Sequence, residues 1–313
     1  MASPPATAIP SMRLTRRETL RPFERALERG FEALMFACAA FAIVVTVGIL
    51  WVLASNSWSF FREVSVVEFL TGRTWSPDIE PTSFGVLPLV NGTLMVTFGA
   101  AALAVPLGLA TAIYLSEFAH ARLRAVFKPA IELLAGIPSI VFGLFAVLVI
   151  SPIVRGVFPD ADVFNALNAT IVLAFMILPI VTTLAEDALR AVPQELRAGA
   201  LALGATRWEV TRQVVVPAAL SGIVAGILLG ISRAIGETMA VTLAAGATPR
   251  MTLDFTQSIQ TMTAFITQRS QGDLVQAGPT FYSLFAVGLL LFVMTFAVNL
   301  LAHRIIRRYR EVY

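Results

Sequence analysis

The chain has 313 residues, of which 57% are hydrophobic and 14% are charged, and its mean hydropathy is +0.78. Because soluble domains carry about 25% charged residues, this composition excludes an ordinary soluble domain and predicts an all-α integral membrane protein embedded in the lipid bilayer. The net charge of +3 gives no indication of nucleic-acid binding. The single cysteine, Cys38, excludes an intrachain disulfide and a thiolate metal site, and we predict no metal.

The N-terminal part of the chain predicts a basic tail followed by a membrane span. Residues 1–30 carry six arginines, and an apolar run over 31–54 follows them. A cleaved signal peptide has a shorter apolar core and a cleavage site of small residues, so we interpret this run as a retained first span. The polar segment over 55–89 then predicts an extracytoplasmic loop.

Five further apolar runs predict the rest of a six-span protein. Each is long enough to cross a hydrocarbon core about 30 Å thick. Together they form a predicted core over 90–303, and a basic tail over 304–313 follows it. The five runs cover residues 90–115, 129–154, 165–185, 218–247 and 280–302.

Prolines fall inside three of these runs, at Pro106, Pro138 and Pro179. Each proline removes a backbone donor and frees a carbonyl group one turn earlier. The prolines therefore predict bent helices. Such bends are common in membrane proteins, but they also favour helices that line a pathway and move.

The distribution of Lys and Arg predicts the orientation in the membrane. If the N-terminus is inside, 17 of the 23 basic residues fall in inner segments and five fall in outer loops. Since the inner loops of membrane proteins are enriched in Lys and Arg, we predict that both termini are cytoplasmic. A second long outer loop then covers residues 248–279.

Two charges, Arg233 and Glu237, lie inside the run over 218–247. An arginine keeps its proton in proteins, and holding it inside a span costs several kcal/mol unless it is paired or hydrated. Residues four apart on a helix can meet, although the reverse order of charges would suit a helix better. On a helix, the two charges also share an arc of about 80° with a ladder of glycines that predicts close packing against another helix. These glycines are Gly222, Gly226 and Gly230.

Two explanations of the charges stay open at this point. Arg233 and Glu237 either form a salt bridge that locks the helix to a neighbour, or belong to an anion site in a water-lined passage. Ionisable residues inside spans favour the second explanation. Ser139 is a further candidate, because its hydroxyl either donates to the same anion or bonds back to its own helix.

The inner segment over 187–217 predicts a helical hairpin. Pro193 suits the first turn of a helix, and Gly204 interrupts the pattern. Thr206 and Glu209 then have the spacing of a capping box, which predicts a second short helix that ends at Pro217. The alternative is an amphipathic segment that lies on the lipid surface.

The stretch LRAGALALGATRWEVTRQVVVPAAL resembles the cytoplasmic coupling loop of ATP-binding-cassette importer permeases, whose pattern is E-A-A-x3-G-x9-I-x-L-P. That pattern falls on Ala198, Gly199, Ala200, Gly204, Val214, Val216 and Pro217, and the chain departs from it at Ala198 and Gly199. The resemblance implies that the loop docks in a groove of an ATPase subunit. The residues it assigns to this coupling are Arg197, Ala198, Ala200, Gly204, Ala205, Thr206, Arg207, Trp208 and Pro217.

Other stretches resemble the phosphate-importer permeases of the PstC type over most of residues 66–250. They are VEFLTGRTWSP, FGVLPLVNGTL, VPLGLATAIYLSEFA, KPAIELLAGIPSIVFGLFA and SRAIGETMAV. The resemblance implies the type I ABC importer permease fold in the cytoplasmic (inner) membrane, and it places Arg233 and Glu237 in a phosphate pathway. It also implies a heterodimer with a second permease (PstA type), two copies of a cytoplasmic ATPase (PstB type) and an extracytoplasmic phosphate-binding protein (PstS type).

The chain has no G-x-x-x-x-G-K-[ST] loop to hold a nucleotide. We therefore expect a non-catalytic subunit that binds no cofactor, with ATP and magnesium used by the partner ATPase. The alternatives are a permease for another oxyanion such as sulfate, the sister phosphate permease PstA, a secondary anion transporter or channel, and a structural or sensory membrane protein. The hairpin argues against a secondary carrier, and the charges inside a span argue against a structural role.

Overall fold

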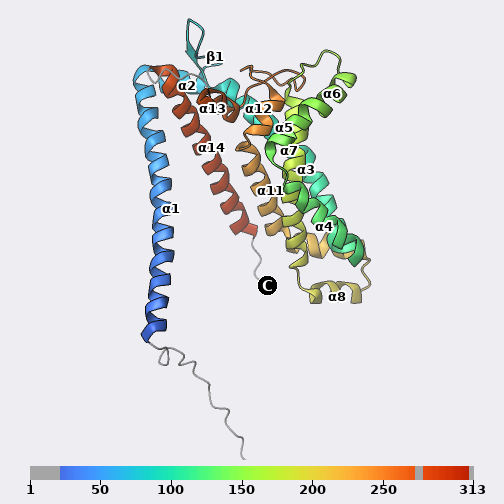
Figure 1. Cartoon of the computed structure of the whole chain (residues 1–313). Coiled ribbons are helices and arrows are strands. Elements are labelled where there is room, and N and C mark those ends of the chain that lie inside the picture. The colour runs from blue at the N-terminus through green and yellow to red at the C-terminus, as the bar shows by residue number, and fades with distance from the viewer. Residues whose placement is uncertain (1–21, 272–277, 310–313) are drawn as a thin grey trace, which may run out of the picture. The chain divides into compact units, whose positions relative to one another are not determined.

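The computed structural model describes residues 22–271 and 278–309, and nearly all of its regular structure is helical (Figure 1). The chain divides into two compact units, residues 1–52 and 53–313. Helix α1 (Pro22–Glu63) begins in the first unit and ends in the second. Its apolar side chains are exposed along most of its length, which is expected of a helix that meets lipid or another protein.

Five helical segments of the described chain are long and apolar enough to cross a bilayer, and a bent pair makes a sixth if it is counted as one span. The bent pair joins Arg207–Ala218 to Leu220–Ile235 at an angle of 68°. The five segments are α1, α3 (Leu87–Ile113) with the π-helix η1 (Tyr114–Phe118), α5 (Ser139–Phe145) with η2 (Ala146–Ile150) and α6 (Ser151–Val157), α7 (Ala166–Arg190), and α14 (Pro279–Tyr309).

The run over 129–154, predicted to be one span bent at Pro138, is divided between two helices in the structure. The structure has α4 (Ala121–Ala135), a break over 136–138, and then α5. Gly136 ends α4, and Pro138 is the residue before α5 rather than a bend within a helix. The residue before a proline is driven out of the helical region, which explains the break. Pro106 and Pro179 do lie inside helices, as predicted.

The prediction of one continuous helix over 218–247 is wrong. The segment begins in α10 (Val216–Ala218), continues after the bend as α11 (Leu220–Ile235), and ends in α12 (Met239–Ala245). Gly236 ends α11, and the following carbonyl group, of Glu237, accepts a hydrogen bond from the Thr263 hydroxyl at 2.8 Å. A side chain from α13 (Met262–Gln271) therefore satisfies a backbone group that the helix would otherwise use.

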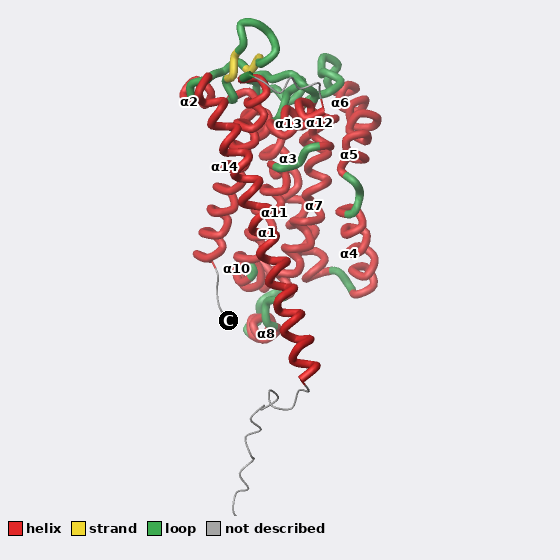
Figure 2. The backbone as a smooth tube through the Cα atoms, turned by 60° about the vertical axis from the view of Figure 1, so that its left-hand side comes forward, coloured by secondary structure: helices red, strands yellow, loops and turns green. Residues whose placement is uncertain are grey.

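Helix α7 is the most deeply buried of the spans in the second unit. It lies beside α3 and α11, as Figure 2 shows, and its side chains supply much of the main core. Leu173 and Ile177 of α7 are packed with Val96 of α3 and with Ala240 and Ala244 of α12. The small residues of α12 let it approach α7 closely, which fits the preference for small side chains between membrane helices.

The glycine ladder of α11 lies against α7. A Cβ atom at Gly222 would lie 2.4 Å from the Cβ of Ala188, and one at Gly226 would lie 2.8 Å from the Cβ of Leu184. Gly230 is likewise buried against this helix. The missing side chains therefore set the distance between the two helices.

We expect Gly222→Ala to destabilise the protein by about 1–3 kcal/mol, because overpacking forces the helices apart. Ala188→Gly in the same chain should restore part of the loss, since it removes the atom that the new methyl group meets. Thermal unfolding of the detergent-purified protein measures both effects. Gly156→Ala is the control, because a Cβ at Gly156 meets nothing within 4 Å. A Gly222 variant as stable as the control would contradict the close contact.

A second core of aromatic side chains lies at the end of the second unit that carries the strands. It joins the end of α1 to α2 (Val66–Thr71), to the short antiparallel strands β1 (Trp75–Ser76) and β2 (Ser83–Phe84), and to α13. Its rings meet edge to face, as with Trp75 and Phe265 at 4.9 Å between centroids. Helices α8 (Gln194–Ala202) and α9 (Arg207–Val210) lie at the opposite end of this unit, and the π-helix η3 (Thr211–Val215) connects α9 to α10 (Figure 1).

Candidate functional site

The predicted helix–glycine–helix hairpin is present. Helix α8 begins after Pro193 and ends before Gly204, whose φ of +88° suits glycine. The capping box at the start of α9 is complete: the Thr206 hydroxyl accepts from the Glu209 N–H at 3.3 Å, and the Glu209 carboxylate accepts from the Thr206 N–H at 2.7 Å. The latter bond holds the pKa of Glu209 below its ordinary value. From Arg207 the chain stays helical to the bend at Ala219.

The hairpin exposes apolar side chains at its tip. Leu203 is 91% exposed and Trp208 is 57% exposed, and Leu201 is exposed beside them. A group of exposed large apolar side chains is typical of a surface that another protein or a membrane covers. Arg197 and Ala200 of α8 are half-buried against the rest of the second unit, whereas Leu203 and Trp208 follow the end of α8.

Arg233 and Glu237 do not form an ion pair with each other. Arg233 lies in the last turn of α11, and its side chain is exposed and forms no salt bridge to any residue that the structure describes. Glu237 lies after the end of α11, where its carboxylate accepts from the Ala240 N–H at 3.4 Å. The single helix face on which we expected both charges is interrupted at Gly236.

Glu237 is instead placed beside a group of threonines. A small cavity of about 10 Å³, the size of one water molecule, is lined by Glu237, by Thr93 and Thr97 of α3, and by Thr261 and Thr263. Sequence reasoning missed these hydroxyl groups. Their signal is the TLMVT repeat of two threonines one helical turn apart inside an apolar run, together with the TMT triplet.

Ser139 is the first residue of α5 and is half-buried. It does not line the cavity beside Glu237. The structure therefore does not bring all three predicted pathway residues into one cavity of this chain.

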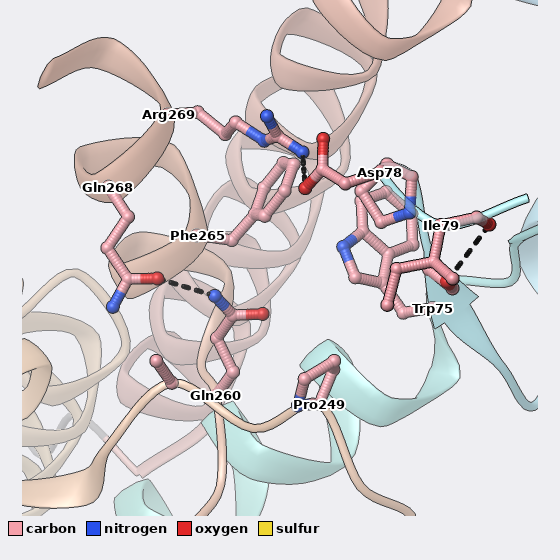
Figure 3. Close-up of a pocket in the computed structure, with 11 residues that line it drawn as sticks. Trp75, Asp78, Ile79, Pro249, Gln260, Phe265, Gln268 and Arg269 are labelled. Atoms are coloured by element: carbon pink, nitrogen blue, oxygen red, sulfur yellow. Dashed lines mark hydrogen bonds and ion pairs between the residues drawn. The ribbon is translucent and has the colours of Figure 1, made fainter. Parts of the chain in front are cut away.

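A larger pocket of about 390 Å³ lies between the β1–β2 loop, α13 and residues 247–260 (Figure 3). Arg269 forms an ion pair with Asp78 across this pocket, and its guanidinium lies 5.7 Å from the centre of the Phe265 ring. On the other side, Gln260 donates to Gln268 at 2.7 Å. The two long polar segments predicted to be outer loops thus meet in one surface.

A cluster of charges that sequence reasoning did not identify ties α4 to α7. Glu186, only 1% exposed, lies 2.9 Å from Lys128 and within 4 Å of Arg124 and Arg190. Lys128 also donates to Asp187 at 2.8 Å, which raises the pKa of Lys128 against the opposing effect of burial. In the sequence, Glu186 and Asp187 form an acidic pair at the end of an apolar run, and the basic segment that contains Arg124 and Lys128 is distant along the chain.

Residues 104–311 match the family of binding-protein-dependent transport system inner membrane components, and the chain belongs to this family. The chain is 34% identical to the phosphate transport system permease protein PstC of Mesorhizobium japonicum, over 96% of each protein. It is 38% identical to a probable ABC transporter permease, YqgH, of Bacillus subtilis, over 85% of this chain and 86% of that protein.

Solved structures show the same fold. A bacterial ABC transporter that imports the polysaccharide alginate matches 93% of this chain and all of that chain, with a TM-score of 0.62 and 14% identity. The MetNI methionine ABC transporter matches 74% of this chain with a TM-score of 0.56 and 19% identity. The chain is thus a helical, multi-pass ABC importer permease by fold and by family.

Proposed function

We propose that this chain is the transmembrane permease subunit of an ATP-driven importer of inorganic phosphate. The observation that carries the proposal is the hairpin of α8 and α9, with its exposed apolar tip, on a chain related to PstC permeases along nearly its whole length. Exposed apolar side chains at the tip of such a hairpin suit a surface on which another protein docks. A secondary carrier or a channel does not require such a surface.

In this proposal the chain crosses the cytoplasmic (inner) membrane six times, with both termini in the cytoplasm. Residues 1–30 and 304–313 are the cytoplasmic tails, and 31–54 is the first span. Residues 90–303 form the permease core. The bias of Lys and Arg toward the inner segments supports this orientation.

The proposed partners follow from the surfaces of the chain. The hairpin over 187–217 docks on one of two cytoplasmic ATPase subunits of the PstB type, which use ATP and Mg²⁺, while this chain binds no cofactor and is not an enzyme. The pocket formed by the loops over 55–89 and 248–279 receives an extracytoplasmic phosphate-binding protein of the PstS type. A second permease of the PstA type completes the heterodimer.

Arg233 and Glu237 have different roles in the proposed pathway. Arg233, exposed in this chain alone, faces the passage shared with the second permease and gives phosphate a transient charge-assisted contact. Glu237 lies close along the chain and repels the anion, which keeps that contact weak enough for release. Ser139 contributes a hydroxyl donor.

The proposed cycle is alternating access. The loaded binding protein docks on the outer loops, and ATP closes the two ATPase subunits. The hairpin passes this movement to the spans, the passage opens outward, and phosphate enters it. Hydrolysis of ATP returns the permease to its inward-open state.

The direct test is to purify the affinity-tagged chain from membranes and to ask which proteins accompany it. We expect a soluble ATPase and a second permease, and we expect the reconstituted complex to take up radiolabelled phosphate only with ATP and the binding protein. Uptake without an ATPase would favour a secondary carrier. Uptake of sulfate in preference to phosphate would favour the permease of another oxyanion.

A further inference from the structure

An ion pair between two largely buried side chains joins helix α8 to the membrane helices. The Arg197 guanidinium donates through Nη1 to both oxygens of the Glu117 carboxylate, at 2.7 and 2.6 Å, and through Nη2 to the Leu189 carbonyl at 2.7 Å. The Arg197 side chain is 13% exposed and the Glu117 side chain 10%. No residue of α8 is fully buried, and this ion pair and Ala200 are two of the contacts that hold the helix against the rest of the second unit.

Glu117 lies in η1, which continues α3 toward the hairpin. Further bonds hold this end of the helix: the Ser116 hydroxyl donates to the Glu117 carboxylate at 2.8 Å, and Arg124 donates to the carbonyls of Leu115 and Ser116. If α8 moves and Arg197 moves with it, the displacement is therefore passed to the end of α3, because the Glu117 side chain and its backbone are held by these bonds.

The other part of α3 reaches the proposed pathway. Thr93 and Thr97 of α3 line the cavity beside the Glu237 carboxylate. The helix from Glu117 to these threonines lacks one backbone hydrogen bond, at Pro106, and is otherwise continuous, so we expect a displacement at Glu117 to be carried along α3 to these threonines. A π-helical stretch, as in η1, is common at functional sites in helices.

The ion pair differs from an ordinary surface salt bridge. Exposed pairs contribute little, because water and salt screen them. When both partners are mostly buried, removing one leaves the other charge without a partner in a poorly solvated place. The Glu186 cluster does not serve the same purpose, because it ties α4 to α7 and does not reach α8.

We infer that the Arg197–Glu117 ion pair is the positioning link through which movement of the hairpin is transmitted to α3 and the pathway. The inference rests on the proposed function of the chain as an ATP-driven permease. It assigns Arg197 to a contact within this chain.

The test uses the complete complex in vesicles, with ATP hydrolysis and phosphate uptake measured on the same preparation. Glu117→Gln and Arg197→Gln should each lower the phosphate taken up per ATP hydrolysed by about tenfold, while the ATPase still co-purifies. The double variant should be no worse than Arg197→Gln alone, because the charge pair is already lost in that variant. Glu132→Gln is the matched control, since Glu132 is exposed on α4 and has no ion pair among the described residues.

Unchanged uptake per ATP in either variant would overturn the inference, as would losses that multiply in the double variant. If the glutamine variants fail to assemble, Arg197→Lys decides, because lysine keeps the charge but cannot reach both Glu117 and Leu189 with a planar fork. An assembled lysine variant that keeps most of the coupling supports the inference, because the charge pair with Glu117 is retained, and one whose coupling falls about tenfold overturns the assignment of the link to that charge pair. If the proposed function itself is wrong, the unaltered complex will show no ATP-dependent phosphate uptake. That result is distinct from a loss of coupling in the variants alone.

Discussion

Replacing Arg233 by glutamine is expected to lower phosphate uptake by roughly tenfold or more, because a hydrogen bond to a charged group contributes about 1.5–3 kcal/mol. The permease should still assemble with its ATPase. Arg233 is exposed and has no salt bridge within the described part of the chain, so its loss leaves no buried charge unpaired. Initial rates of radiolabelled phosphate uptake, normalised to the amount of assembled complex, measure the effect.

Two further variants sharpen this test. Arg233→Lys keeps the charge without the planar fork, so we expect uptake between that of the unaltered protein and that of the glutamine variant. Arg122→Gln removes an exposed arginine of α4, away from the proposed pathway, and should leave uptake unchanged. If Arg233→Gln fails to assemble, the salt-bridge explanation gains support, with a partner outside this chain. Normal uptake in that variant would remove Arg233 from the pathway.

Replacing Gly204 by proline is expected to uncouple ATP hydrolysis from uptake. Proline fixes φ near −65°, whereas Gly204 has φ of +88°, so the turn between α8 and α9 cannot form as it stands. Uptake per ATP should fall by about tenfold or more, since the coupling energy of one element is about 1–3 kcal/mol. The measurement compares hydrolysis and uptake in the same vesicles.

Gly204→Asn is the matched variant for this position. Asparagine tolerates positive φ far better than most residues do, and a Cβ at Gly204 meets nothing within 4 Å. It should therefore retain most of the coupling. Equal transport by the proline and asparagine variants at the level of the unaltered protein would count against the role of the hairpin.

The hairpin was predictable because its signals are local. Gly204, Thr206 and Glu209 lie within six residues, and each acts on the backbone beside it. The apolar runs were predictable for a similar reason, since composition alone places a segment in lipid. Pro138 predicted a bend but not the full break that the structure has there, and the break at Gly236 was not predicted, because neither break changes the hydropathy of its run appreciably.

The geometry of the charges could not be read from spacing. An interval of four residues brings Arg233 and Glu237 together only on an unbroken helix, and α11 ends between them. The contact that replaces the helix bond comes from Thr263, which is distant along the chain. The Arg197–Glu117 pair joins residues 80 positions apart, which no local pattern specifies.

Because of the bend at Ala219, a small rotation there moves the far end of α11 by a larger distance. The second helix of the hairpin continues through this bend into α11 without an intervening loop. Arg233 lies 14 residues after Ala219, which is about 21 Å along a helix. A rotation of about 10° at this bend would therefore move the Arg233 guanidinium by about 4 Å, which is more than the length of a hydrogen bond. In the proposed function, a modest tilt of the hairpin would therefore be sufficient to bring the arginine into or out of reach of phosphate.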